Sequence, residues 1–194
     1  MAKKRLAPAT ALYPVPVVMV TCVDKSGRAN IVTVTWTGTV CSEPPMIGIS
    51  VRPGRFSHPM IKGTGEFVAN IPSAEQLHAL DYVGTISGRN CADKFESAGL
   101  TPLPAALVKA PLIKECPVNL ECKVRKTLTL GTHTHFLAEV VAVGDGSNDV
   151  ALLSSAGLAI AMGNALAEVK AVADHVTLDV DHSGVAAAIS KYLL

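Results

Sequence analysis

Short apolar blocks separated by turn-forming residues run along most of this chain, and this pattern predicts strands rather than long helices. Residues 15–23 (VPVVMVTCV) are apolar and β-branched, four turn-forming residues follow, and 29–36 resume the strand pattern. This spacing predicts a β-hairpin with a four-residue loop. Two further long strands are predicted over 118–130 and 133–143, with a turn at Gly131 between them.

Shorter elements are expected between and after these strands. The predicted shorter strands cover 46–51, 66–72, 165–172 and 176–180, and the predicted helices cover 57–62, 73–83, 93–97, 152–162 and 184–194. Ser57 is suited to cap the first of these helices, and Ser73 with Gln76 forms a capping box before the second. A regular alternation of strand and helix is absent. We therefore predict a mainly β fold, an antiparallel split β-barrel (Greek-key, with about six to seven strands) and small peripheral helices.

Composition adds an expectation about partners. The 194 residues are 49% hydrophobic and 17% charged, and the mean hydropathy of +0.36 is apolar for a lone domain. We therefore expect a partner to cover part of the apolar surface. The formal net charge of +1 gives no electrostatic reason to propose nucleic acid. The most membrane-like stretch, 151–167, is interrupted by Ser, Gly and Asn and is short for a bilayer span, so we expect a buried helix and no membrane.

The cysteines and the N-terminus favour a cytoplasmic protein. No long apolar core of a signal peptide follows the basic residues at the start. The five cysteines are scattered without CxxC spacing, which favours reduced thiols in the cytoplasm. Cys41 is expected to be a small buried residue, the alternative being a thiol close to a binding pocket.

Three threonines are expected to present hydroxyls on one face of the strand pattern. Thr33, Thr35 and Thr37 recur at every second position, so they would share a face. An ordinary strand whose threonines face solvent is the alternative, because threonine is a good strand former. The opposite face would carry Val32, Val34 and Trp36.

A basic turn follows the strand predicted over 46–51. Arg52, Arg55, Ser57 and His58 lie within seven residues around a turn and a helix start. The planar donors of arginine suit phosphate, and a helix N-terminus adds free amides and a positive dipole end. The alternative is a pair of solvated arginines beside a serine that only caps.

Other common sites are not supported. The chain lacks GxGxxG, GxxxxGK[ST] and GxSxG, which argues against a Rossmann dinucleotide site, a P-loop and a serine hydrolase. His133 and His135 lie on one strand face as a metal pair would, but no third ligand stands at a telling spacing. No metal site is therefore predicted.

The order of four motifs resembles a known family. TVTW (33–36), FVANIP (67–72), SGRNCADKFESAGLTPLPA (87–105) and GTHTHFLAEVVAV (131–143) together resemble the flavin reductase-like family of FMN-binding split barrels, and most of all its flavoredoxin branch. The resemblance spans about residues 13–170. Where relatives carry an aromatic residue, this chain has Gly163-Asn164-Ala165-Leu166.

The resemblance implies FMN held non-covalently in a homodimer, near the subunit interface. Residues 30–37 would run along the flavin ring, with Thr33 near its reactive N5 edge, and His133 would lie near the nicotinamide position. The implied catalytic residues are Thr33, Lys94 and His133. The implied cofactor-binding residues are Asn30, Thr33, Val34, Thr35, Trp36, Thr37, Ser50, Val51, Arg52, Arg55, Ser57, His58, Asn70 and Lys94.

The function that follows is an FMN-binding oxidoreductase. It would pass electrons from NAD(P)H or a redox protein, such as a ferredoxin-like donor, to a flavin, a ferric complex or a partner protein. The alternatives are an FMN-bound carrier without NAD(P)H turnover and a non-redox flavin-binding protein. The expected domain covers residues 1–170, with an extension over 171–194 packed on the same domain or on the dimer seam.

Overall fold

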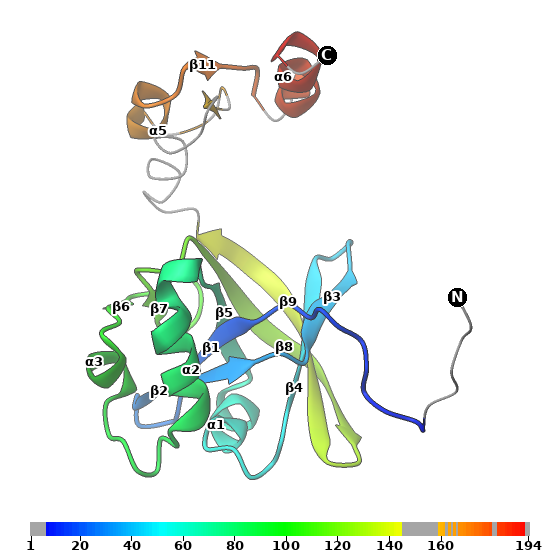
Figure 1. Ribbon diagram of the computed structural model, residues 1–194, viewed down its shortest axis with the longest axis vertical. Coiled ribbons are helices and arrows are strands. Elements are labelled where there is room, and N and C mark those ends of the chain that lie inside the picture. Colours follow the sequence, from blue (N-terminus) through cyan, green and yellow to red (C-terminus); the bar gives the residue numbers. More distant parts are fainter. Residues whose placement is uncertain are drawn as a thin grey trace.

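One seven-stranded antiparallel sheet forms the main body of the protein (Figure 1). The computed structural model describes residues 7–144, 159–161, 163, 165, 167–179 and 182–192. The strand order is β2-β1-β5-β8-β9-β4-β3. The strands are β1 (Val18–Val23), β2 (Ala29–Val34), β3 (Thr37–Cys41), β4 (Met46–Val51), β5 (Glu66–Ile71), β8 (Val118–Leu130) and β9 (His133–Gly144). The predicted mainly β split-barrel architecture is confirmed.

The sheet curls because its two edge strands are consecutive in the chain. Only Thr35 and Trp36 separate β2 from β3. The amide of Ser50 in β4 donates to the carbonyl of Trp36 at 2.8 Å. This bond draws the two edges together at the place where the chain crosses between them.

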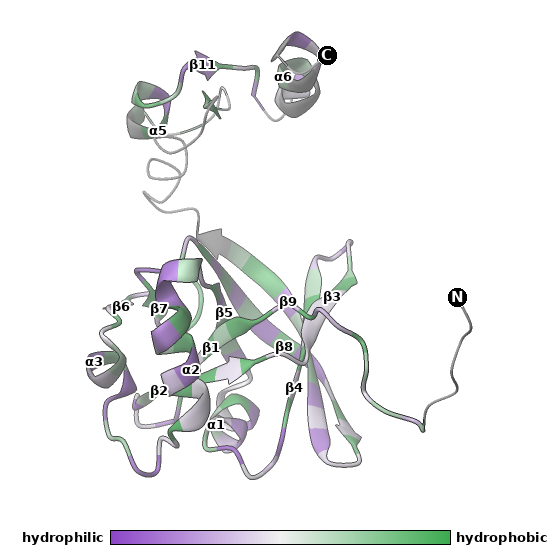
Figure 2. Ribbon diagram, viewed as in Figure 1, coloured by the Kyte–Doolittle hydropathy of each residue, from purple (hydrophilic) through white to green (hydrophobic). Residues whose placement is uncertain are grey.

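Small helices lie around the sheet (Figure 1). They are α1 (Ser57–Thr64), the 3₁₀ turn η1 (Ala74–Gln76), α2 (Leu77–Thr85) and α3 (Lys94–Ala98). A two-stranded hairpin of β6 (Pro102–Leu103) and β7 (Leu112–Ile113) completes this part. In Figure 2, α2 carries both hydrophilic and hydrophobic residues, as expected for a helix with one face on the sheet.

The core has two layers, one on each side of β1. The first layer fills the inside of the curl with side chains such as Phe67, Phe136 and Ile49. The second layer lies under α2 and α3 and contains Met19 and Val83. All six residues of β1 are buried because both faces of this strand are covered.

The predicted hairpin of β1 and β2 is confirmed, but the strand predicted over 29–36 is too long. Val34 is the last residue of β2 and pairs with Val18, the first residue of β1. Beyond that pair β1 offers no partner, and Thr37 pairs instead with Ile49 of β4 at the opposite edge. The prediction that Thr37 shares a strand face with Thr33 is therefore wrong.

The helix signals had mixed outcomes. The predicted capping box of Ser73 and Gln76 is present, and α3 ends at Gly99, whose backbone is left-handed. Ser57 does not cap α1: Phe56 is the N-cap residue and no side chain caps it. The Ser57 hydroxyl instead accepts a hydrogen bond from the Asn30 amide at 2.6 Å, so Ser57 ties α1 to β2.

The C-terminal elements differ from the main sheet. The strands β10 (Ile160–Ala161) and β11 (His175–Val176) pair in parallel, with α5 (Ala167–Ala171) between them, and α6 (Gly184–Tyr192) follows. Figure 1 shows them beyond the end of β9, apart from the sheet. Whether 171–194 covers the barrel or a dimer seam stays a prediction.

The predictions for this segment had mixed outcomes too. The strand predicted over 165–172 is wrong, because alanine, glutamate and lysine favour the helix α5 found there. The helix predicted over 184–194 is confirmed as α6. The turn 145–149 and most of the helix over 152–162 lie outside the described residues, and the end of that helix is β10 instead. Within the described ranges, no helix combines the length and hydropathy needed to cross a bilayer.

Candidate functional site

Two adjoining cavities lie where β2 and β4 meet the turn before α1. The first cavity, of about 360 Å³, is lined by Val32, Thr33, Val34, Thr35, Trp36, Ser50, Val51, Arg52, Arg55 and His133. The second, of about 170 Å³, is lined by Asn30, Val32, Gly54, Arg55, Phe56, Ser57, Val83, Gly84, Ile86, Ser87, Gly88, Arg89 and Lys94. Val32 and Arg55 line both cavities. The two cavities are therefore immediate neighbours with part of their lining in common.

An aromatic pair borders the first cavity. The rings of Trp36 and His133 are stacked, with centroids 6.1 Å apart and planes 8° apart. Partial burial, with a smaller contribution from the Arg52 cation, lowers the pKa of His133. A neutral imidazole stacked on an indole offers a flat, weakly polar wall, which suits an aromatic ligand.

The hydroxyl of Thr33 is committed to the scaffold. It donates to the carbonyl of Leu80 in α2. A Cβ built on Gly84 would lie 2.9 Å from the Thr33 Cβ, so α2 packs directly on β2 here. Thr33 lines the first cavity as predicted, while its hydroxyl fixes α2.

Three cationic side chains line the second cavity: Arg55, Arg89 and Lys94. No acidic residue among the described part of the chain lines either cavity. The first residues of α1 lie at the same cavity, where the positive end of a helix dipole favours an anion. This set of groups suits a phosphate.

Lys94 is the most deeply placed of these cations. Its ammonium donates to the carbonyls of Ile31 and Val83, both at 2.8 Å, and only 4% of the residue is exposed. Burial lowers the pKa of Lys94 to about 8. An ammonium has three protons to donate, so after two carbonyls one remains for a ligand.

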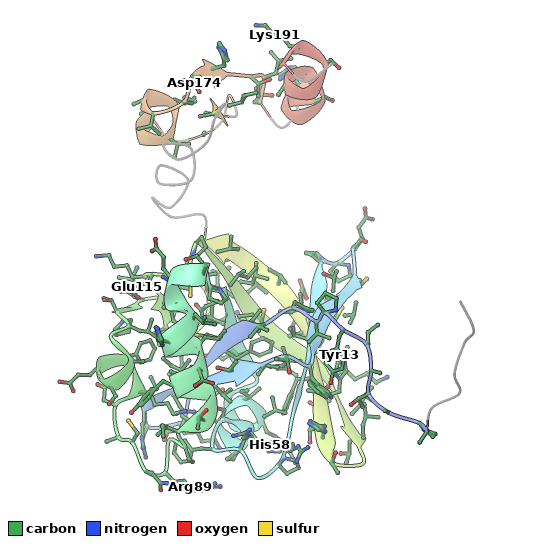
Figure 3. All side chains as sticks on the ribbon, viewed as in Figure 1. Tyr13, His58, Arg89, Glu115, Asp174 and Lys191 are labelled. Atoms are coloured by element: carbon green, nitrogen blue, oxygen red, sulfur yellow. The ribbon has the colours of Figure 1, made fainter. Side chains whose placement is uncertain are left out.

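The two arginines that flank Phe56 hold the walls of the second cavity. Arg28 donates to the carbonyl of Gly88 at 2.7 Å, and Arg89 donates to the carbonyl of Gly54 at 3.0 Å. Their guanidinium carbons lie 4.8 Å and 6.0 Å from the Phe56 ring centroid. Figure 3 shows Arg89 at the outer edge of this region.

Most of the predicted site residues meet at these cavities, and three do not. Thr37, His58 and Asn70 line neither. His58, marked in Figure 3, lies in the core, where its Nε2 is 2.9 Å from the Thr134 hydroxyl and burial lowers its pKa. The role predicted for these three residues finds no support in the geometry.

Asn70 acts as a structural link inside the fold. Asn70 is fully buried. Its side-chain Nδ2 donates to the Met19 carbonyl at 2.8 Å, and its side-chain Oδ1 accepts from the Ile113 backbone amide at 3.0 Å. It therefore joins β5 to β1 and to β7.

Sequence reasoning missed several residues of the second cavity. Arg89 belongs to the SGR motif but was not predicted as a site residue, and Phe56 was likewise overlooked. Arg89 could have been found from the sequence, because it lies in one of the four motifs that resemble the family. Phe56 gave no signal, since only the fold brings it between two arginines. Cys41 lines neither cavity and is half-buried; its thiol donates to the Glu43 carbonyl at 3.3 Å.

Adding a methyl group at Gly88 is expected to destabilise the second cavity. A Cβ there would lie 2.4 Å from the Asn30 Oδ1 and 2.5 Å from a Phe56 ring carbon. Gly88→Ala should cost about 1–3 kcal/mol in the free energy of unfolding, measured by urea denaturation. Gly63→Ala in α1 is the control, because nothing beyond its chain neighbours and its own helix backbone lies within 4 Å of its added Cβ, and alanine should keep or raise the stability of a helix. An equal stability for both variants would contradict this packing.

The family described as flavin reductase like domain matches residues 10–157. An uncharacterized protein of Archaeoglobus fulgidus is 36% identical over 135 residues, which cover 70% of this chain and 75% of that protein.

Two flavoredoxin structures are similar to this chain. That of Desulfovibrio vulgaris (Miyazaki F) is 37% identical with a TM-score of 0.68, covering 74% of this chain and 76% of the flavoredoxin. That of Methanosarcina acetivorans is 30% identical with a TM-score of 0.69, covering 75% of this chain and 76% of that flavoredoxin.

A second similarity covers the C-terminal part. A haloacid dehalogenase-like hydrolase family matches residues 130–189. The phosphatase YwpJ of Bacillus subtilis is 50% identical over 58 residues, which are 30% of this chain but only 20% of the phosphatase. Residues 163–166, which depart from the split-barrel pattern, fall within 130–189. No phosphatase activity follows from so small a share of that protein.

Proposed function

The chain belongs to the flavin reductase-like family of FMN-binding split barrels, and from this membership we propose that it binds FMN non-covalently and passes electrons through it. The observation that carries the proposal is the pair of adjoining cavities, one with an aromatic wall and one with three cations and no carboxylate. The isoalloxazine ring would occupy the first cavity and the phosphate the second. The residues of both cavities fit these two ends of the molecule in polarity and charge.

The protein's own groups would bind and orient the cofactor. Lys94, Arg55 and Arg89 would hold the phosphate, since charge-assisted hydrogen bonds to oxygen anions are the stronger ones. Trp36 and His133 would border the ring. FMN, when bound, supplies the hydride and one-electron chemistry, and the protein supplies binding, orientation and electrostatics.

For the electron source we propose NAD(P)H or a ferredoxin-like redox protein, and for the acceptor a flavin, a ferric complex or a partner protein. Two functions are then possible: an oxidoreductase that turns over NAD(P)H, and an FMN-bound carrier without NAD(P)H turnover. The likeness to flavoredoxins, up to 37% identity in the structures named above, favours the carrier. Anaerobic mixing separates the two. Bleaching of bound FMN by NADH or NADPH at catalytic rates supports the oxidoreductase, and bleaching only by a reduced redox protein supports the carrier. A preparation that takes up no FMN would contradict both and would leave the chain without a flavin function.

We also propose a cytoplasmic homodimer with the flavin near the subunit interface. Exposed apolar side chains next to the first cavity support it: Trp36 lines that cavity and is 43% exposed, and Val40 in the adjoining β3 is 48% exposed. Light scattering on the purified protein tests the oligomeric state, and a monomer at micromolar concentration would contradict the proposal.

The pKa of Lys94 predicts how FMN affinity changes with pH. The ammonium that would bind the phosphate is fully present below a pKa of about 8 and is lost from the free protein above it. Affinity should therefore fall as pH rises through 8, by up to about tenfold per pH unit for one linked proton. Fluorescence titrations of FMN between about pH 7 and about pH 9.5 measure this. A flat profile would mean that Lys94 does not carry the phosphate charge, and Lys94→Met should give that flat profile.

A further inference from the structure

We propose that His135 is a positioning residue that fixes the hydroxyl of Ser50 at the first cavity. Ser50 lines this cavity, whereas His135 does not. The Ser50 Oγ and the His135 Nδ1 are 2.8 Å apart, well within hydrogen-bond distance. The proposal rests on the proposed function only in its choice of FMN as the ligand.

The pairing of β4 with β9 places these two side chains together. Ser50 and His135 are direct cross-strand partners. Directly opposite residues on one face of an antiparallel pair have their Cβ atoms about 4.5–5.5 Å apart, which is close enough for a hydroxyl to reach a ring nitrogen. The contact is therefore set by strand register and does not depend on a loop.

Gly48 makes room for the imidazole. A Cβ on Gly48 would lie 2.6 Å from both the Cε1 and the Nε2 of His135. The ring thus lies against the backbone of β4, over a position where any larger residue would displace it. The γ-carbon of Val40 lies 3.3 Å from the same point, so Val40 borders this space as well.

This arrangement decides what Ser50 offers to a ligand. A hydroxyl has one hydrogen to donate and two lone pairs to accept. When Ser50 donates to a bare Nδ1, only lone pairs remain for the cavity; when Nδ1 carries the hydrogen, Ser50 accepts and its own hydrogen is left for the cavity. In the first tautomer the O–H is held toward the ring, and in the second it is turned away from the ring and toward other acceptors.

The test is a double-mutant cycle on FMN dissociation constants, measured by fluorescence quenching with the full chain. Ser50→Ala and His135→Ala should each weaken binding about five- to tenfold, the size of one hydrogen bond. The double variant should be no weaker than either single one, because the two residues act as one unit. His135→Asn, which can return a polar atom near the Nδ1 position, should recover most of the affinity. His78→Ala, which removes an exposed histidine outside both cavities, should change nothing.

The outcomes separate this inference from the proposed function. A wild-type protein that binds no FMN overturns the proposed function, and the inference about FMN falls with it. If the wild type binds FMN but the His135→Ala and Ser50→Ala effects multiply in the double variant, His135 does not act through Ser50. An unchanged affinity in His135→Ala, or the absence of rescue by asparagine, would likewise overturn the inference.

Discussion

Replacing Lys94 by methionine is expected to weaken FMN binding about 30-fold or more at neutral pH, which corresponds to about 2 kcal/mol. Methionine keeps most of the length and apolar volume of the side chain but removes the charge and its three donors. The ammonium is charged at pH 7, since its pKa is about 8. It sits 2.8 Å from two carbonyls that fix its position at the second cavity, so it needs no rearrangement to meet a phosphate.

Fluorescence titration of FMN against the purified variant measures this effect. Lys62→Met is the matched control, because Lys62 is an exposed lysine in α1 that lines neither cavity. The control should keep the wild-type affinity. Equal dissociation constants for Lys94→Met and the wild type would show that the phosphate lies elsewhere.

Replacing Asn70 by leucine is expected to cost about 2–4 kcal/mol of stability, because one or two buried polar backbone groups would lose their partner. The groups affected are the Met19 carbonyl and the Ile113 amide, of which the amide keeps a longer bond of 3.3 Å to the Asn119 Oδ1. This is a large part of the 5–15 kcal/mol that is typical of a folded protein. The fraction that remains folded should bind FMN with wild-type affinity, since Asn70 lines neither cavity.

Urea denaturation gives the stability of the Asn70 variant, and an FMN titration under folded conditions gives its affinity. Asn30→Ala is the comparison, because Asn30 is also a buried asparagine but lines the second cavity and bonds Ser57. Only the Asn30 variant should lose affinity. A stable Asn70 variant with weakened FMN binding would restore Asn70 to the binding site.

The strands were predictable because their signals are local. Alternation and turn residues identified the hairpin of β1 and β2, and the long strands β8 and β9 matched their predicted ranges closely. The crossing at Thr35 and Trp36 was not predictable from alternation, because strand-forming residues continue through it. β2 ends at Val34 because the chain then crosses to the opposite edge of the sheet, where Thr37 pairs with Ile49.

In the candidate site too, the residues identified by local motifs were predictable, and those brought together only by the fold were not. Residues that follow one another in a motif, such as Thr33 to Trp36, line one cavity. Asn70 lines neither cavity, and a buried asparagine that satisfies backbone groups has the same sequence appearance as one that binds a ligand. Phe56 and the wall formed by Arg28 and Arg89 depend on hydrogen bonds between residues 60 and 35 positions apart, which no local pattern records.

The C-terminal elements were predicted less well than the strands of the main sheet. The prediction of a strand over 165–172 gave too much weight to its apolar residues, whereas Ala167–Ala171 form α5. The parallel pair β10 and β11 lies within residues 130–189, which match a hydrolase family. This pairing contrasts with the antiparallel main sheet, and the resemblance to split barrels carried no information about it.

The proposed function requires that one ligand, FMN, uses both cavities. The most direct measurement is a calorimetric titration of the flavin-free protein with FMN and, separately, with riboflavin, which has the same ring but no phosphate. We expect one FMN per chain, bound about 100-fold more tightly than riboflavin, because riboflavin lacks the several charge-assisted hydrogen bonds to phosphate. Equal affinities for the two flavins, or no binding of either, would contradict it.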